Sequence, residues 1–322
     1  MTGQQTTSIP KELQSLKPFF HDIDLGNGFN TAPDTHRMIE MENLFFPILV
    51  NVCGGNLNGK RVLDVGCNCG GFSFAAKRFG AKEVVGIDSD EKNIQQAQAV
   101  KKYLNIDGVS FIKMTAEELD IDKIGEFDVA IVAGIIYHLS NPLDVIKKIA
   151  DITKSVLLID SHVHYSSNTS EEDIPSWWML SDTDQNDFDG LFSNNEQLAN
   201  EYMKFEQSKS VNYGKLTNQF MPSPSTLRDM EFLMENIPNS VGEVRTDCNI
   251  GSAKPGQLVF IPNKKAIIKA VRHNGFEDVV EIVPHRFSSY PYLGKFRVGM
   301  IAIKRSQDGF FPQSIIHQKL IK

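Results

Sequence analysis

Long hydrophobic runs are absent from this chain of 322 residues. No apolar stretch approaches the roughly 20 residues that a membrane-spanning helix needs, so we expect no association with a membrane. The N-terminus, Met-Thr-Gly-Gln-Gln-Thr-Thr-Ser, lacks the charged and then apolar order of a secretory signal peptide. These absences predict a soluble protein located in the cytoplasm.

Cysteine is scarce, and basic charge is outweighed by acidic charge. The four cysteines, Cys53, Cys67, Cys69 and Cys248, form no CxxC pair, which argues against a disulfide framework and favours reduced thiols. The formal net charge is -7, and no block of Lys and Arg is visible. Binding to a phosphate backbone needs clustered cations, so the composition favours a small-molecule substrate over a nucleic acid, although a local basic patch is not excluded.

Residues 60–90 are the stretch around which the rest of the chain is organised. A short apolar run, 62–65, predicts a buried parallel strand, and a helix with apolar residues at helical spacing is expected at 72–79. A second apolar run, 84–87, ends at Asp88. The order of strand, glycine turn, helix, strand and acid is typical of the nucleotide-binding half of a doubly wound fold.

The turn itself departs from the dinucleotide-binding pattern GxGxxG. It reads Asp-Val-Gly-Cys-Asn-Cys-Gly, with Asn68 in place of the second glycine and Asp64 at its head. Gly66 and Gly70 let the backbone approach a ligand closely. An acid at the head would repel a pyrophosphate and attract an ammonium and a sulfonium, so the stretch resembles motif I of class I S-adenosylmethionine (SAM)-dependent methyltransferases. An NAD-binding domain or a non-nucleotide α/β domain is the alternative.

The remaining pattern predicts an α/β fold of the Rossmann-like methyltransferase type, a mostly parallel seven-stranded sheet with helices on both faces and an antiparallel last strand. Further strands are expected at 109–113, 127–133, 156–160, 279–283 and 296–304, with helices at 35–52 and 91–104. The sheet is expected to resume at 258–261, which leads to a helix at 264–273. We divide the chain into an N-terminal helical lid (1–58), a SAM-binding core (59–160), an inserted substrate cap (161–257) and the C-terminal part of the core (258–322).

The cofactor is expected at the carboxyl ends of the parallel strands. Asp64 and Gly66 would hold the amino acid end of SAM and Asp88 its ribose, while Ala116 and Glu117 would lie at the adenine. The other expected cofactor-binding residues are Asn68, Gly70, Ser89 and Gly134. For Glu117 the alternative is a helix-capping or solvated acid.

Tyr137 and His138 follow the fourth predicted strand, beside the place where a methyl group would be presented. His138 is the first candidate for a general base, and the alternative is a histidine that packs under the following helix. His21, in a polar N-terminal stretch with Asp22, is a second catalytic candidate because this stretch could close over the substrate. Tyr137 would shape the pocket or hydrogen-bond the ligand.

His162 and His164 are expected to follow the fifth strand, after Asp160. The pattern Asp-x-His-x-His is compatible with a metal site, but bonds to neighbouring loops are the commoner role, so we predict substrate contacts and no metal. Trp177 and Trp178, in the insertion, would stack on a flat substrate or fill the core of the cap.

Two longer segments, Gly59 to Gly71 and Gly134 to Leu143, resemble class I methyltransferases grouped with the bacterial tRNA wobble-uridine (5-oxyacetate) carboxymethyltransferase and its generic small-molecule members. The resemblance implies that the tRNA enzyme's carboxy-SAM site, formed by a Lys, a Tyr and an Arg, is matched by Tyr137, by Arg297 and, through a loose alignment, by Lys17.

The leading hypothesis is therefore methyl transfer from SAM to an oxygen or nitrogen of a small, sugar-like or specialised metabolite. The alternatives are tRNA carboxymethylation with carboxy-SAM and a SAM-binding protein without turnover.

Overall fold

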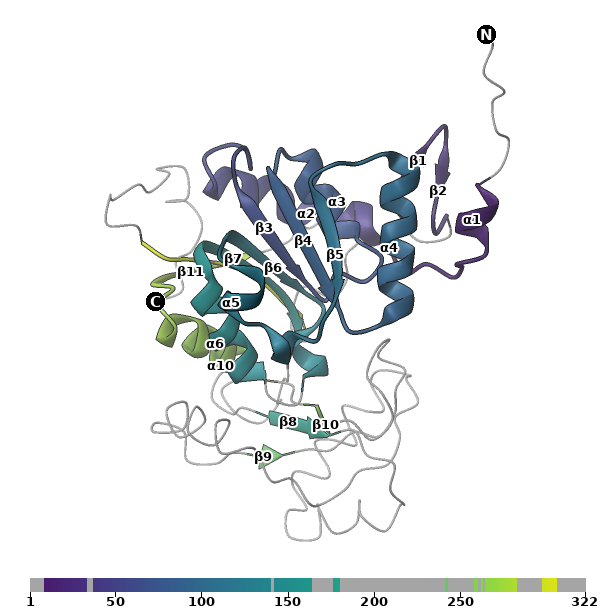
Figure 1. The fold of residues 1–322 in the computed structure, drawn as a ribbon. Helices are drawn as coiled ribbons and strands as arrows, with labels where there is room; N and C mark the ends of the chain where they lie inside the picture. The colour runs from purple at the N-terminus through teal and green to yellow at the C-terminus, as the bar shows by residue number, and fades with distance from the viewer. Residues whose placement is uncertain are drawn as a thin grey trace, which may run out of the picture.

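A mixed sheet of seven strands forms the centre of the molecule, in the order β11-β12-β7-β6-β3-β4-β5 (Figure 1). The computed structural model describes residues 9–33, 37–139, 142–163, 176–179, 241–242, 258–259, 262, 264–282 and 297–305. The pairs within β7, β6, β3, β4 and β5 are parallel, and β12 is antiparallel to both of its neighbours. This arrangement confirms the predicted fold class.

The strands and helices of the core alternate along the chain. The strands are β3 (Arg61–Val65), β4 (Glu83–Asp88), β5 (Val109–Lys113), β6 (Phe127–Ala133), β7 (Thr153–His162), β11 (Asp278–Ile282) and β12 (Arg297–Ile303). The helices are α3 (Gly71–Arg78), α4 (Glu91–Leu104), α5 (Ile121–Ile124), α6 (Pro142–Ile152) and α10 (Lys264–His273), with short 3-10 turns η1 (Ala116–Glu118) and η2 (Ile136–His138).

Two hydrophobic clusters, one on each face of the sheet, bury these elements. Successive residues of a strand point to opposite faces, so Val62 packs with α2, α3 and α4, whereas Leu63 and Val65 pack with α6 and α10. Both faces are covered, which explains why the central strands are almost continuously apolar instead of alternating.

The N-terminal segment packs against the α3 and α4 side of the sheet. It comprises α1 (Lys11–Gln14), a hairpin of β1 (Asp24–Gly26) and β2 (Phe29–Asn30), and α2 (Arg37–Val52). The hairpin turns at Asn27-Gly28, where both residues have positive φ. Gln96, in α4, donates hydrogen bonds to the carbonyls of Leu16 and Pro18 and so ties the segment to the core.

Two details of the sequence prediction were wrong. The fifth strand is longer than expected, because β7 starts directly after α6 and its pairing with β12 continues through His162 opposite Arg297. Residues 258–259 do not rejoin the large sheet. They form β10 (Leu258–Val259), which pairs with β8 (Ser176–Met179) in a separate three-stranded sheet with β9 (Val241–Gly242).

This small sheet lies below the large one in Figure 1. Of the predicted substrate cap, 161–257, only residues 161–163, β8 and β9 are among the described residues. The domain boundaries within the chain remain predictions. Among the described residues, no helix is long and apolar enough to cross a membrane.

Candidate active site

The turn between β3 and α3 is shaped for close approach by a ligand. Gly66, Asn68 and Gly70 all have positive φ, with values of 71°, 50° and 91°. A Cβ on Gly70 would lie 2.8 Å from the Phe111 ring, so the position has no room for a side chain. Asn68 tolerates the left-handed conformation, and its side-chain oxygen accepts the N–H of Cys69 at 2.8 Å. Asn68 thus supplies the backbone shape that a second glycine would give.

Asp88 ends β4 and is held rigidly beside this turn. One carboxylate oxygen accepts the N–H of Asn68 at 2.9 Å. The other accepts the N–H of Asp90 at 2.9 Å and the side-chain amide of Asn93 at 3.1 Å. The carboxylate is therefore oriented before any ligand arrives. Sequence reasoning missed Asn93, although its position five residues after Asp88, at the start of α4, was a usable signal.

Asp64 lies beneath the turn and is only 1% exposed. Its Oδ2 accepts a hydrogen bond from the Ser73 hydroxyl at 2.6 Å. Burial is the main cause that raises the pKa of Asp64 from its ordinary value of 3.8 to about 7, and the charge of Asp88 adds to the effect. Ser73 was not among the predicted site residues, because its contact with Asp64 depends on the packing of α3 against β3.

The residues predicted for the adenine lie at the carboxyl end of β5. Ala116 is buried in η1, and Glu117 is partly buried. The Glu117 carbonyl accepts a hydrogen bond from Lys148 of α6, which fixes this turn against the helix. Ser89 is exposed just after β4, and Gly134 follows β6 with a φ of 77°.

A compact group of polar and aromatic side chains stands at the ends of β6, β7 and β12. The guanidinium of Arg297 donates two hydrogen bonds to the carboxylate of buried Asp160, one of them at 2.8 Å from Nε. Its Nη1 lies 3.1 Å from Nε2 of His162. The His162 ring meets the Tyr137 ring edge-on at a centroid distance of 4.6 Å, and His138 lies 4.2 Å from Tyr137. We call these five residues the acceptor wall.

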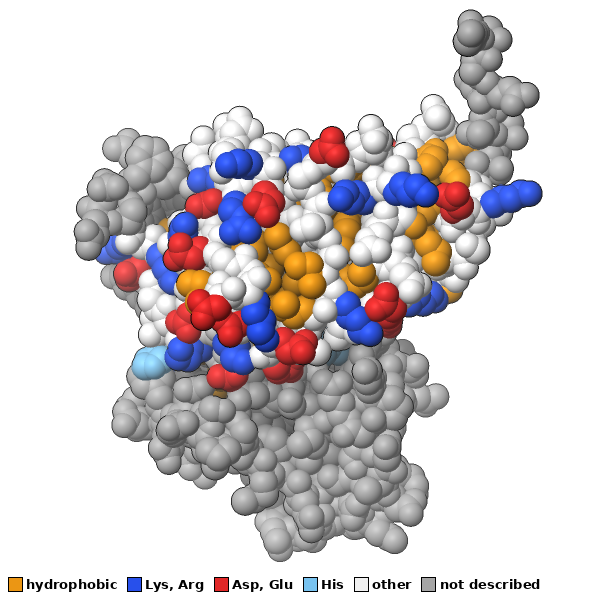
Figure 2. All heavy atoms as spheres, in the orientation of Figure 1, with side chains coloured by type: hydrophobic (Ala, Val, Ile, Leu, Met, Phe, Trp, Pro, Cys, Tyr) orange, Lys and Arg blue, Asp and Glu red, His pale blue; other side chains and the backbone are white. Residues whose placement is uncertain are grey.

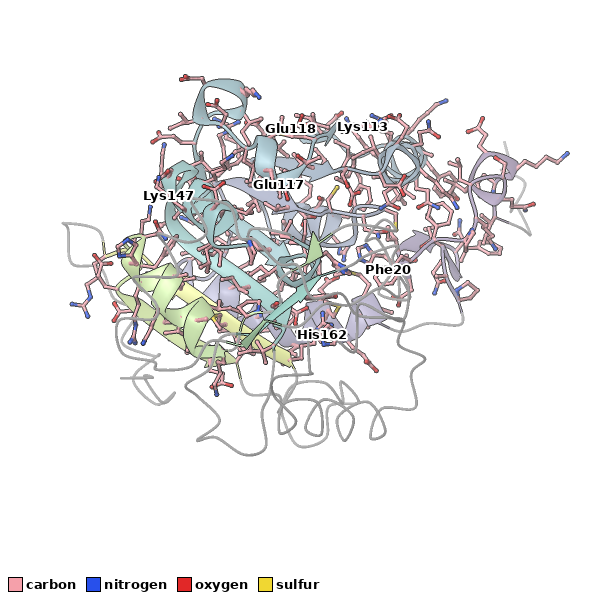
Figure 3. All side chains as sticks on the ribbon, turned by 90° about the horizontal axis from the view of Figure 1, so that it is seen from below. Phe20, Lys113, Glu117, Glu118, Lys147 and His162 are labelled. Carbon is pink, nitrogen blue, oxygen red and sulfur yellow. The ribbon has the colours of Figure 1, made fainter. Side chains whose placement is uncertain are left out.

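Arg297 determines the tautomer of His162, and burial keeps His138 neutral. A guanidinium has only donors, so Nε2 of His162 accepts, and the ring proton is on Nδ1. Burial, with a smaller contribution from the charge of Arg297, lowers the pKa of His138 from 6.5 to about 4. Both imidazoles are therefore neutral at pH 7. Figure 3 views this edge from below, with His162 and Phe20 labelled near the middle and Glu117 further toward the top.

His21 contacts the glycine turn from the N-terminal segment. Its Nδ1 accepts the N–H of Gly71, the first residue of α3, at 3.1 Å. A neutral imidazole that accepts at Nδ1 carries its proton on Nε2, so His21 presents a donor on that side. This geometry fits a positioning role for His21 better than the role of a base.

The remaining predicted residues fall partly outside the described chain. His164 is one of these, and for Trp177 and Trp178 only the strand β8 is described, without side chains. The structure contradicts the expectation that His162 follows the strand, since His162 is the last residue of β7. Among the described residues, no group of three or more His, Cys, Asp or Glu side chains could hold a metal, and Asp160 and His162 contact Arg297.

Comparison with known proteins decides what this arrangement is. A family described as "Methyltransferase domain" matches residues 56–213. The N-terminal domain of EvdMO1, crystallised in the presence of SAH (S-adenosylhomocysteine) and D-fucose, superposes with a TM-score of 0.52 at 15% identity, covering 92% of this chain and 94% of that one. Residues 56–213 therefore match a methyltransferase domain, and the fold is that of class I SAM-dependent methyltransferases.

Curated relatives of this methyltransferase are tRNA U34 carboxymethyltransferases. The protein of Actinobacillus succinogenes is 40% identical over 89 residues, which are 27% of each chain. The protein of Haemophilus influenzae is 32% identical over 116 residues, which are 34% of this chain and 36% of that one. The chain thus spans only about a quarter to a third of the length of these relatives.

The methyltransferase has the features that SAM requires. The backbone at Gly134 is open, because a Cβ there would meet its nearest neighbour, the Tyr137 hydroxyl, only at 3.7 Å. Hydrogen bonds from the chain fix the orientation of the Asp88 carboxylate, as the predicted contact with the ribose hydroxyls would require. These residues fit the cofactor, which supplies an electrophilic methyl group on sulfur when bound.

Proposed function

We propose that this methyltransferase acts on an oxygen or nitrogen of a small, sugar-like or specialised metabolite. The observation that carries the proposal is the Asp160–Arg297 pair, because it neutralises the one cation of the acceptor wall. The acceptor wall then offers rings and neutral imidazoles, which suit an uncharged acceptor. The described part of the face in Figure 2 shows acidic and basic side chains interspersed, and the net charge is -7.

The residues of the acceptor wall would orient the acceptor and exclude water. Alignment of a nucleophile in line with a transferable methyl group accounts for much of the acceleration in such reactions. Tyr137 is 7% exposed and lies between both imidazoles, so it would form the side of the pocket.

His138 would take the proton that the acceptor loses. Its pKa of about 4 keeps it neutral at pH 7, so it can accept a proton there. The activity should therefore show no fall between pH 7 and pH 5.5 from protonation of His138. His138→Asn should lower kcat about 10²- to 10⁴-fold, the usual contribution of a general base, with the SAH dissociation constant unchanged. Full activity of this variant would remove the base assignment.

The proposal as a whole is tested in two steps. Native mass spectrometry of the purified protein should show bound SAM or SAH. Methyl transfer from isotopically labelled SAM is then measured on a panel of free and nucleotide-linked sugars, starting with deoxyhexoses because the EvdMO1 domain was crystallised with D-fucose. Transfer only to tRNA would refute a small-molecule acceptor.

Carboxymethylation of tRNA U34 with carboxy-SAM is the second candidate. It is supported by the relatives named above and by Tyr137 and Arg297, which lie together in the acceptor wall. Lys17 is exposed in the segment before β1. A bound mass larger than SAM by one carboxyl group in the native spectrum would place this candidate first.

A further inference from the structure

The carboxylate of Asp22 is buried, and only one of its two oxygens has a hydrogen-bond partner among the described residues. The residue is 2% exposed, and its Oδ1 accepts the N–H of Met38 at 2.6 Å. Within the described part of the chain, its Oδ2 is buried and has no hydrogen-bond partner. A carboxylate oxygen removed from water without a donor is costly, and it points to a donor that arrives with a ligand.

Two neighbours of Asp22, His21 and Met38, contact the glycine turn. His21 accepts the N–H of Gly71 at 3.1 Å, and its own backbone N–H lies 3.4 Å from the sulfur of Cys69. A Cβ on Gly71 would lie 2.5 Å from the sulfur of Met38. The residue that precedes Asp22 and the residue that donates to it are thus both in contact with the turn that carries the cofactor.

The surroundings of Asp22 favour a negative charge and leave that charge without a cation. Met38 is the second residue of α2, a helix of 16 residues whose positive end faces the carboxylate. Nδ1 of His21 accepts a hydrogen bond and so carries no proton, which means that the His21 ring is not a cation. Among the described residues no Lys or Arg is paired with Asp22.

The other acids at the turn are already engaged. Asp64 lies beneath the turn with Oδ2 bonded to Ser73, and both oxygens of Asp88 accept bonds from the chain. The amino acid end of SAM is expected at Asp64 and Gly66, so its ammonium group would reach this turn. We propose that Asp22 binds this α-ammonium group and that the N-terminal segment thereby completes the cofactor site.

The test compares ligands that differ in the amino acid portion. SAH carries the α-ammonium group, desamino-SAH carries hydrogen in its place, and 5'-methylthioadenosine lacks the whole portion. The variant Asp22→Asn keeps an oxygen for the N–H of Met38 and removes the charge. Asp24→Asn is the matched control, because Asp24 is exposed and its Oδ1 accepts only the nearby N–H of Gly26 at 2.8 Å.

Dissociation constants from calorimetry should separate the two variants. Asp22→Asn should lower the affinity for SAH about tenfold to a hundredfold, which is the usual contribution of a hydrogen bond between charged groups. The affinity for 5'-methylthioadenosine should stay unchanged. Asp24→Asn should change neither. Equal weakening of both ligands would show that Asp22 serves only the fold, and unchanged SAH binding would refute the contact.

A measurement on the unmodified protein covers the case in which Asp22→Asn does not fold. Wild type should bind SAH at least about tenfold more tightly than desamino-SAH, since a charged hydrogen bond is missing in the second complex. Equal affinities would overturn the proposal. The contact concerns the cofactor alone, so the outcome is independent of which acceptor the enzyme uses.

Discussion

Ionisation of Asp64 should make the ligand-free protein less stable at neutral and alkaline pH. The folded protein holds the proton of Asp64 up to a pKa of about 7, whereas the unfolded chain releases it near 3.8. Between these values the unfolded state binds fewer protons, so the free energy of unfolding falls as the pH rises and levels off above pH 7. This increase in the pKa of Asp64 corresponds to a loss of about 4 kcal/mol in the free energy of unfolding.

The variant Asp64→Asn isolates the contribution of Asp64 ionisation to the free energy of unfolding. Asparagine keeps an oxygen to accept the Ser73 hydroxyl bond and cannot ionise. Urea denaturation gives the free energy of unfolding of both proteins from pH 4 to pH 8. Over this range the free energy of unfolding of the variant should rise by about 4 kcal/mol relative to that of wild type. Asp90→Asn, at an exposed N-cap, should give a curve parallel to wild type. Parallel curves for Asp64→Asn as well would show that Asp64 is ionised in the folded state at low pH, and the reasoning from its burial would fail.

Three further substitutions test the rest of the site. Asp88→Ala should weaken SAH at least about a hundredfold in calorimetry, because it removes the acceptor for the ribose hydroxyls; unchanged affinity would refute the ribose assignment. Gly70→Ala should cost about 1–2 kcal/mol from its left-handed backbone alone, and more from the contact with Phe111, in urea denaturation, whereas a neutral effect would mean that the turn relaxes freely. Arg297→Met should cost about 3–5 kcal/mol because it leaves Asp160 buried without its cation, and a stable variant would contradict the importance of that pair.

Local pattern was sufficient to predict the strands, the turn and the helix on which the expected cofactor-binding residues lie. The glycines, the apolar runs and Asp88 lie within 30 residues, so propensity and spacing determine β3, the turn, α3 and β4 together. The three-dimensional placement of Asn68 and Asp88 followed from that order.

The acceptor wall depends on pairing between distant segments, which local pattern does not encode. Asp160 and Arg297 are 137 positions apart in the sequence. His162 was expected beyond the fifth strand because the end of β7 is set by its partner β12, not by its own residues. The buried state of Asp22 also depends on tertiary packing, since the sequence shows only an acid in a polar stretch.

The position of β12 has a consequence for the order in which the protein is made. β12 is the last strand of the sheet in the sequence, yet it lies between β7 and β11. Until residue 303 has left the ribosome, β7 has an open edge, and Asp160 lacks the cation that compensates it. The cofactor half can assemble early during synthesis, whereas the acceptor wall is completed only at the end, so C-terminal truncation should produce a chain with an exposed strand edge and a tendency to aggregate.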